Sequence, residues 1–280
     1  MIIDEKTLVI EKLKEKARDI RIDILKMITN AEAGHPGGSL SATDILTALY
    51  FNVMRIDPSN PRWENRDRFV LSKGHACPVL YATLAEKGYF DKSHLGKLRK
   101  LGSILQGHAD MNKTPGVDMT VGSLGQGLGV GVGMALAAKY LGLDFHTWVL
   151  IGDGECQEGS IWEAALSGNK WNLSNLTAII DNNGIGNDSF TKSTMPVEPL
   201  SKKWESFGWE VVECDGHNMA NLLDALNFAN SAIKKPVAII AKTIKGKGIS
   251  FMENEPEWHG KAPNEKELLL ALEELNRSFS

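Results

Sequence analysis

The sequence predicts an α/β fold in which a mostly parallel sheet carries helices on both faces. One observation is a strand–helix–strand pattern, in which the short apolar runs 147–151 and 176–180 flank a segment of helical periodicity. Two strands joined in this way are expected to be parallel, with their carboxyl ends at one edge. A second observation is that strand-like and helix-like segments also alternate in the rest of the chain. No Pro/Gly/Ser-rich linker interrupts them, so residues 1–280 are predicted to form a single domain.

The first third of the chain begins with a predicted amphipathic helix over residues 4–29, where apolar residues recur at three- and four-residue steps. A loop with three glycines and a proline, 33–39, follows this helix. A short strand at 69–72 then leads through the turn 73–76 into another helix. The region 91–118 is polar and lacks periodicity, so it is expected to be irregular.

The second half continues the alternation of strands and helices. Strands are predicted at 209–213 and 236–242, with a helix over 218–233 between them. The segment 184–203 is polar, contains two prolines and shows no periodicity, so we expect a flexible flap there. A short helix over 268–275 closes the predicted domain.

Composition and charge exclude several classes of function. The chain is 42% hydrophobic and 24% charged, with a net charge of −4 and scattered basic residues, so nucleic acid is not an expected partner. Its three cysteines are far apart, which argues against a disulfide framework or zinc site and fits a reducing compartment. No signal peptide and no apolar run long enough for a bilayer is visible, so we expect a cytoplasmic protein without a membrane partner.

Polar side chains follow the two strands of the central pattern. Asp153 lies in a Gly-Asp-Gly turn after the first strand, and Asn183 follows the second strand thirty positions later. Both are therefore expected at the carboxyl edge of the sheet, where open α/β sheets bind ligands. Carboxylate and amide oxygens suit Mg²⁺ or Ca²⁺, and a magnesium ion with few protein ligands completes its shell with phosphate oxygens and water. The spacing favours a magnesium–diphosphate site over two ordinary turns.

Four of the seven histidines lie in glycine-containing loops: His35, His75, His108 and His259. Imidazole is suited to moving protons near neutral pH, and loops often carry catalytic groups. Each histidine alone is a weak candidate, but together with a diphosphate site they form a credible cluster. The other three are expected to be inert: His94 and His146 in surface-like contexts, and His217 in shaping a turn.

The glycine-rich segment 122–133 needs its own explanation, because glycine disfavours a helix. For residues 122–124 we favour close approach of the backbone to a cofactor. For the later glycines, close packing between elements and cofactor contact remain equally open.

A set of short motifs in fixed order resembles the transketolase family over essentially the whole chain. The motifs are GHPGGSLS, LSKGHA, QGHAD, GSLGQGL, GDGECQEGS, DNN and KTIKGKG…WHGK. The pair GDG and NN, about thirty residues apart, also resembles the general signature of thiamine-diphosphate enzymes. The resemblance implies thiamine diphosphate and Mg²⁺ as cofactors, with Ca²⁺ as a possible substitute for the metal, and the diphosphate-binding fold.

The resemblance also implies roles for individual residues. His35 and His259 would handle protons on substrate hydroxyls, and His108 would meet the terminal hydroxyl of the donor. Magnesium would be held by Asp153, the Asn183 side chain and the Ile185 carbonyl. The implied cofactor contacts are His75, Gly122, Ser123, Leu124, Asp153, Gly154, Asn183, Lys245 and His259. Glu158 is similar to a buried acid that links two active sites, which makes it both a catalytic and a cofactor-binding candidate.

The implied reaction is transfer of a two-carbon ketol unit from a ketose to an aldose, free or phosphorylated. The chain departs from the family in length, because a complete transketolase is more than twice as long. The pyrimidine-binding and C-terminal domains are missing. We therefore expect a split transketolase whose partner chain supplies them, with two copies of each chain and no activity from this chain alone.

Other interpretations remain open within and outside thiamine chemistry. The chain could be the α subunit of a 2-oxo-acid dehydrogenase or a relative of deoxyxylulose-phosphate synthase, although GHPGGSLS and WHGK favour transketolase. It could also be a non-catalytic paralogue with a binding or regulatory role, although the intact Asp153, Asn183 and loop histidines argue against this.

Overall fold

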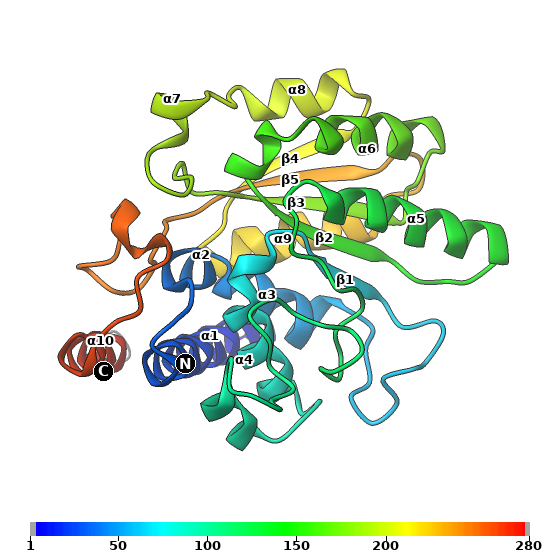
Figure 1. The fold of residues 1–280 in the computed structure, drawn as a ribbon. Helices are drawn as coiled ribbons and strands as arrows, with labels where there is room; N and C mark the ends of the chain where they lie inside the picture. Colours follow the sequence, from blue (N-terminus) through cyan, green and yellow to red (C-terminus); the bar gives the residue numbers. More distant parts are fainter. Residues whose placement is uncertain (1–3, 278–280) are drawn as a thin grey trace.

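A computed structural model describes residues 4–277, which contain a parallel sheet with strand order β1-β2-β3-β5-β4 (Figure 1). All four neighbouring pairs are parallel. The strands are β1 (Arg68–Leu71), β2 (Thr147–Gly152), β3 (Leu176–Asn182), β4 (Glu210–Asp215) and β5 (Val237–Lys242). The predicted α/β class with a parallel sheet is thus confirmed.

The helices between residues 4 and 277 alternate with these strands along the chain. They are α1 (Glu5–Ala31), α2 (Pro36–Ser41), α3 (Thr43–Ala48), α4 (Cys77–Lys87), α5 (Gln126–Leu141), α6 (Gly159–Lys170), α7 (Thr191–Thr194), α8 (Leu200–Ser206), α9 (Met219–Asn230) and α10 (Glu265–Arg277). Short 3₁₀ or π turns cover Leu49–Val53, Gly74–Ala76, Lys92–Lys97, Gly154–Gln157 and Pro256–His259. None of these helices combines the length and the hydrophobicity that a bilayer span requires.

Helices cover both faces of the sheet, as predicted (Figure 1). Successive strand residues point to opposite faces. Trp148 and Leu150 of β2 therefore join the core formed with α1, α3, α4 and α9, whereas Val149 and Ile151 join the core under α5, α6 and α8. Burial of the central strands on both sides explains why they read as continuous apolar runs.

The parallel arrangement places the functional loops together. Because all five strands run in one direction, their carboxyl ends lie at one edge of the sheet. The loops after β1, β2, β3 and β5 carry His75, Asp153, Asn183 and Lys245. Four segments that are distant in sequence therefore meet at that edge.

The segment 184–203, for which a flexible flap was expected, contains secondary structure. An antiparallel bridge joins Ile185 to Phe190, and α7 and the start of α8 follow. Val197 and Leu200, with Trp204 beyond the segment, are buried against the sheet. These few apolar anchors are spread among polar residues, so they order the segment without creating a visible period.

Two further expectations need correction. The loop predicted over 33–39 becomes helical at Pro36, because proline is well suited to the first position of a helix. His146 is only 6% exposed rather than superficial, and its Nε2 lies 2.8 Å from Thr177 Oγ1. It precedes β2 directly and stacks near Trp148, a contact that its polar sequence neighbours do not reveal.

Candidate active site

A cavity of about 310 Å³ opens at the carboxyl edge of the sheet. Loops that follow four of the five strands contribute to its lining. Nine of the residues singled out from the sequence line it: His75, Leu124, Asp153, Gly154, Glu158, Asn183, Ile185, Lys245 and His259. The fold therefore gathers most of the candidate residues around one space.

Asp153 lines this cavity and is 2% exposed, at the point where β2 gives way to a short 3₁₀ turn. Its Oδ2 accepts a hydrogen bond from the Gly184 backbone N–H at 2.8 Å. Among the described residues, no ion pair reaches its carboxylate. Burial, reinforced by the nearby Asp181 carboxylate, raises the pKa of Asp153 to about 6. The charge of Lys245 offsets part of this rise, but a buried carboxylate that makes no ion pair within residues 4–277 is a favourable place for a cation.

Oxygen atoms from the loop after β3 share the cavity with Asp153. Asn183 lines it, and the Asn183 Oδ1 accepts from the Ile185 N–H at 3.1 Å. The Ile185 carbonyl accepts from Lys245 Nζ at 3.1 Å, so it already faces a positive charge.

This donor set fits a hard cation better than a transition metal. Within residues 4–277, no group of three His, Cys, Asp or Glu side chains could hold a metal. One carboxylate with amide and carbonyl oxygens leaves several coordination positions for phosphate oxygens and water, which is the usual arrangement of protein-bound Mg²⁺.

Lys245 forms the cationic wall of the cavity. It is 2% exposed, and its Nζ donates to the Gly186 carbonyl at 2.6 Å and to His259 Nδ1 at 2.7 Å. Burial, together with the charge of Lys73, lowers the pKa of Lys245 to about 8. It therefore remains largely protonated at neutral pH and can meet an anion.

Three histidines form a cluster beside the cavity. The ring centroid of His35 lies 5.2 Å from that of His75 and 5.3 Å from that of His259, and the last two are 5.0 Å apart. Burial and neighbouring cations, Lys73 for His75 and Lys245 for His259, lower the pKa of His75 to about 2 and of His259 to about 4. Burial, with Arg99, also lowers the pKa of His35. These imidazoles are neutral at pH 7, so they can both donate and accept.

The ring of His35 has an unused nitrogen. Its Nδ1 is buried and has no hydrogen-bond partner within the described part of the chain. Such an orphaned atom in a cluster next to a cavity is available to a ligand or a water molecule.

His108, in the region 91–118, does not line the cavity. Its ring lies against Gly122, where an added Cβ would be 3.2 Å from His108 Cγ. Burial and the nearby Arg99 lower its pKa. His108 and residues 122–124 are all exposed, and of these only Leu124 lines the main cavity.

The structure resolves the open question about the later glycines of this segment. An added Cβ at Gly127 would lie 2.3 Å from Ser72 Oγ, and one at Gly131 would lie 2.4 Å from Val149 Cγ2. These two glycines allow α5 to pack closely on the sheet. Gly129 and Gly133 are exposed, and a Cβ there would meet nothing within 4 Å.

Glu155 is a site residue that sequence reasoning missed. It is 3% exposed, and its Oε1 accepts from the Gly125 N–H at 2.8 Å and from Ser72 Oγ, while its Oε2 accepts from the Gly152 N–H at 3.1 Å. It thus ties together three loops at the edge of the sheet. The expected acid, Glu158, is exposed in this chain and lies at the cavity lining. Two glutamates follow the same turn, and nothing in their spacing shows which is buried.

Lys73 and Asp181 were also missed as site residues, although Lys73 lies in the motif LSKGHA and Asp181 in the motif DNN. They form a buried ion pair, and Lys73 Nζ also donates to the Gly38 carbonyl at 2.8 Å. Asp181 accepts in addition from Ser41 Oγ at 2.6 Å. Their position at the carboxyl ends of β1 and β3 could have identified them from the sequence, because Asp153 was identified by the same kind of position.

Comparison with known proteins agrees with this geometry. The family model described as "Transketolase, thiamine diphosphate binding domain" matches residues 12–276. The chain is 46% identical over 265 residues to a 6-deoxy-6-sulfo-D-fructose transketolase subunit of Clostridium sp. (strain MSTE9), covering 95% of this chain and 96% of the relative. It is 42% identical over 267 residues to an apulose-4-phosphate transketolase subunit of Phocaeicola vulgatus, with 95% of each chain covered.

Solved structures show the same likeness. A transketolase from Leishmania mexicana superimposes with a TM-score of 0.91 at 30% identity, covering 94% of this chain. The match spans only 41% of the Leishmania chain. The present chain therefore corresponds to less than half of that protein.

Proposed function

The chain belongs to the transketolase family, and from this premise we propose that it is the N-terminal subunit of a two-subunit transketolase. In this proposal residues 1–280 act as one diphosphate-binding unit. The subunit takes part in moving a two-carbon ketol unit from a ketose to an aldose, with sugars or sugar phosphates as substrates.

The observation that carries the proposal is the buried carboxylate of Asp153, which has no ion-pair partner in residues 4–277 and shares one cavity with Asn183, Lys245, His75 and His259. A cation at Asp153 would offset the electrostatic cost of its burial. The ammonium of Lys245 and the neutral imidazoles supply donors to phosphate oxygens. One cavity thus contains a carboxylate for the metal ion, an ammonium for the diphosphate and imidazoles for proton transfer, which together match the needs of a magnesium–diphosphate cofactor.

Each residue has a defined task in this proposal. Asp153, the Asn183 side chain and the Ile185 carbonyl would hold Mg²⁺, for which Ca²⁺ could substitute. Thiamine diphosphate, when bound, supplies the nucleophilic carbon and the electron sink needed to cleave a carbon–carbon bond beside a carbonyl. Gly154, Lys245, His75 and His259 would bind its diphosphate, and the backbone of residues 122–124 would border it.

Proton transfer is assigned to the histidines that burial keeps neutral. His35, through the Nδ1 left open among the described residues, would accept and return protons on substrate hydroxyls together with His259. His108, beside Gly122, would bind the terminal hydroxyl of the donor. Lys245 donates to His259 Nδ1, so the hydrogen of a neutral His259 lies on Nε2.

A partner chain is the second part of the proposal. Two relatives covered over 95–96% of their own length carry the word "subunit" in their names, whereas the solved Leishmania transketolase is more than twice as long. We propose that a separate chain supplies the pyrimidine-binding and C-terminal domains, in an assembly with two copies of each chain. The exposed Glu158 would become buried there and link two sites.

The test is a ketol-transfer assay with thiamine diphosphate and Mg²⁺, on the chain alone and mixed with the product of the adjacent reading frame. Activity is expected only in the mixture, and Asp153→Asn should abolish it. Asp57→Asn, at an exposed carboxylate in the loop before β1, is the matched control and should retain activity.

Other results would contradict parts of the proposal. Turnover by the chain alone would exclude the need for a partner. An acyl rather than a ketol product would indicate a 2-oxo-acid enzyme. Magnesium-dependent binding of the cofactor without turnover of any donor would indicate a non-catalytic paralogue.

A further inference from the structure

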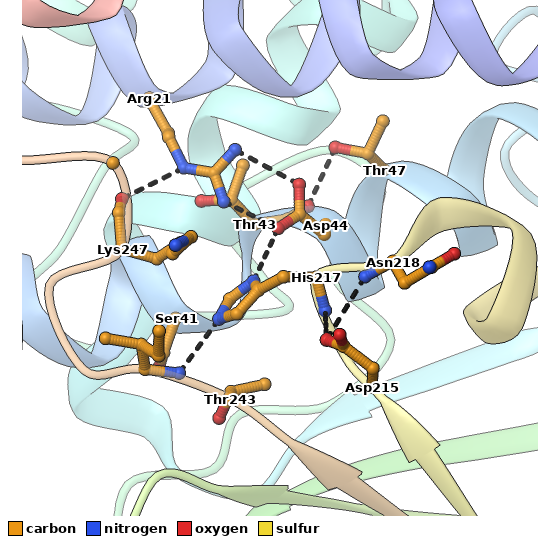
Figure 2. A network of polar contacts seen from close by, with 12 residues as sticks. Arg21, Ser41, Thr43, Asp44, Thr47, Asp215, His217, Asn218, Thr243 and Lys247 are labelled. Carbon is orange, nitrogen blue, oxygen red and sulfur yellow. Dashed lines mark hydrogen bonds and ion pairs between the residues drawn. The ribbon is translucent and has the colours of Figure 1, made fainter.

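A buried polar network lies outside the cavity lining and connects three distant segments of the chain (Figure 2). It consists of Arg21 on α1, Asp44 on α3 and His217 after β4. Arg21 donates two hydrogen bonds to the Asp44 carboxylate, at 3.1 Å and 2.7 Å, and Asp44 Oδ2 lies 2.7 Å from His217 Nδ1. The side chains are only 8%, 10% and 11% exposed, so water does not compete strongly for these bonds.

The hydrogen bonds define the tautomer of His217. The backbone N–H of Ile244 donates to His217 Nε2 at 2.8 Å. A backbone amide can only donate, so Nε2 must carry a lone pair and Nδ1 must carry the hydrogen. His217 therefore donates from Nδ1 to Asp44 and accepts at Nε2, and both ring nitrogens are used.

The network holds the loop after β5 on both sides of Lys245. His217 holds the Ile244 N–H, and Arg21 Nε donates to the Lys247 carbonyl at 3.1 Å. This loop has no regular structure of its own. The buried Nζ of Lys245 contacts the Ile185 and Gly186 carbonyls and His259, so a shift of its backbone would change all three contacts.

We propose that His217, fixed by Asp44 and Arg21, is a positioning residue that sets Lys245 and His259 for the diphosphate, an inference that rests on the proposed function. His217 does not line the main cavity and would not touch the cofactor. His217 acts by binding the Ile244 amide, and in this way it fixes the position of the Lys245 ammonium. Shaping the turn, the role expected from the sequence, uses only its backbone, whose N–H donates to Asp215 Oδ1 at 2.9 Å.

Two substitutions test separately the donor at Nδ1 and the acceptor at Nε2 of His217. His217→Asn keeps a donor at the Nδ1 position and removes the acceptor for the Ile244 N–H. His217→Gln carries an acceptor oxygen near the Nε2 position and can restore that bond. His146→Asn is the matched control, because His146 is a buried, hydrogen-bonded histidine that precedes β2, away from the loop after β5.

The experiment measures binding of Mg²⁺ with inorganic pyrophosphate to the full chain by calorimetry, and exchange of the Ile244 amide by NMR. His217→Asn should weaken binding about tenfold, as expected for loss of one buried hydrogen bond, and should speed exchange of the Ile244 amide. His217→Gln should restore most of the affinity, and His146→Asn should leave both readouts unchanged. The His259 ring resonances should shift in His217→Asn only.

Several results would overturn the inference. Unchanged affinity in His217→Asn would exclude a positioning role, and equal loss in His217→Gln would show that the acceptor at Nε2 is not what matters. Equal weakening in His146→Asn would mean that general destabilisation is responsible. Should the wild type not bind magnesium pyrophosphate, the proposed function fails, while the Ile244 and His259 readouts still decide the role of His217.

Discussion

The ammonium of Lys73, which lines the candidate cavity, forms an ion pair with the carboxylate of Asp181, and these side chains are only 3% and 0% exposed. Lys73 follows β1 and Asp181 belongs to β3, so β2 lies between their strands in the sheet. Burial alone would raise the pKa of Asp181, but Lys73 and the hydrogen bonds from Ser41 and Thr243 outweigh it and lower the pKa. The pair connects the ends of strands whose loops carry the candidate site.

Removing one partner of this pair should be costly. We expect Lys73→Met to lower the free energy of unfolding by about 3–5 kcal/mol, because it leaves a buried charge without compensation. Urea unfolding measures the change. Lys6→Met, in an ion pair that is about two-thirds exposed, is the control and should cost less than about 1 kcal/mol. Equal costs for the two variants would contradict the importance of the buried pair.

Asp153 should reduce the stability of the free chain. Its folded pKa, about 6, lies above the unfolded value of 3.8, so its contribution is most favourable below pH 3.8 and is lost as the pH rises through 6. Asp153→Asn should therefore raise the free energy of unfolding at pH 8 by about 2–3 kcal/mol. The same variant should lose the stabilisation that Mg²⁺ with pyrophosphate gives to the wild type. A destabilised Asp153→Asn variant in the absence of ligand would refute this account.

Two glycines of α5 should respond oppositely to alanine. Gly131→Ala should destabilise by about 1–3 kcal/mol, because its Cβ would lie 2.4 Å from Val149 and the close helix–sheet contact would have to open. Gly133→Ala should stabilise the isolated chain by about 0.5–1 kcal/mol, because its position is open and alanine favours the helix. Thermal unfolding of both variants is the measurement, and a shift of the same sign in both would contradict the packing role of Gly131.

Lys245 should influence the titration of His259. Burial and the Lys245 charge together hold the pKa of His259 at about 4, so Lys245→Met should raise this pKa while burial keeps it below 6.5. NMR titration of the histidine rings checks the change. The pKa of His146, about 3 because of its burial before β2, should not move. An unchanged His259 pKa would show that the two groups are not coupled.

The sequence alone determined the fold class and most of the candidate site. Apolar runs such as 147–151 and 176–180 identify buried strands because burial on both faces leaves few polar positions in them. A helical segment between two such strands dictates parallel pairing, and parallel pairing places Asp153 and Asn183 at one edge. The order of the motifs carried the family assignment, which the comparisons support.

Only the tertiary structure decided which polar residues are buried and what they contact. Glu155 rather than Glu158 is enclosed, His146 lies inside, and the ring of His217 connects Asp44 with Ile244. These contacts join residues far apart in the chain, as in the 173 positions between Asp44 and His217. The local sequence pattern indicates whether a segment is a helix or a strand and where each strand ends. It does not record which side chain from a distant element completes a hydrogen bond, because that depends on how the layers pack.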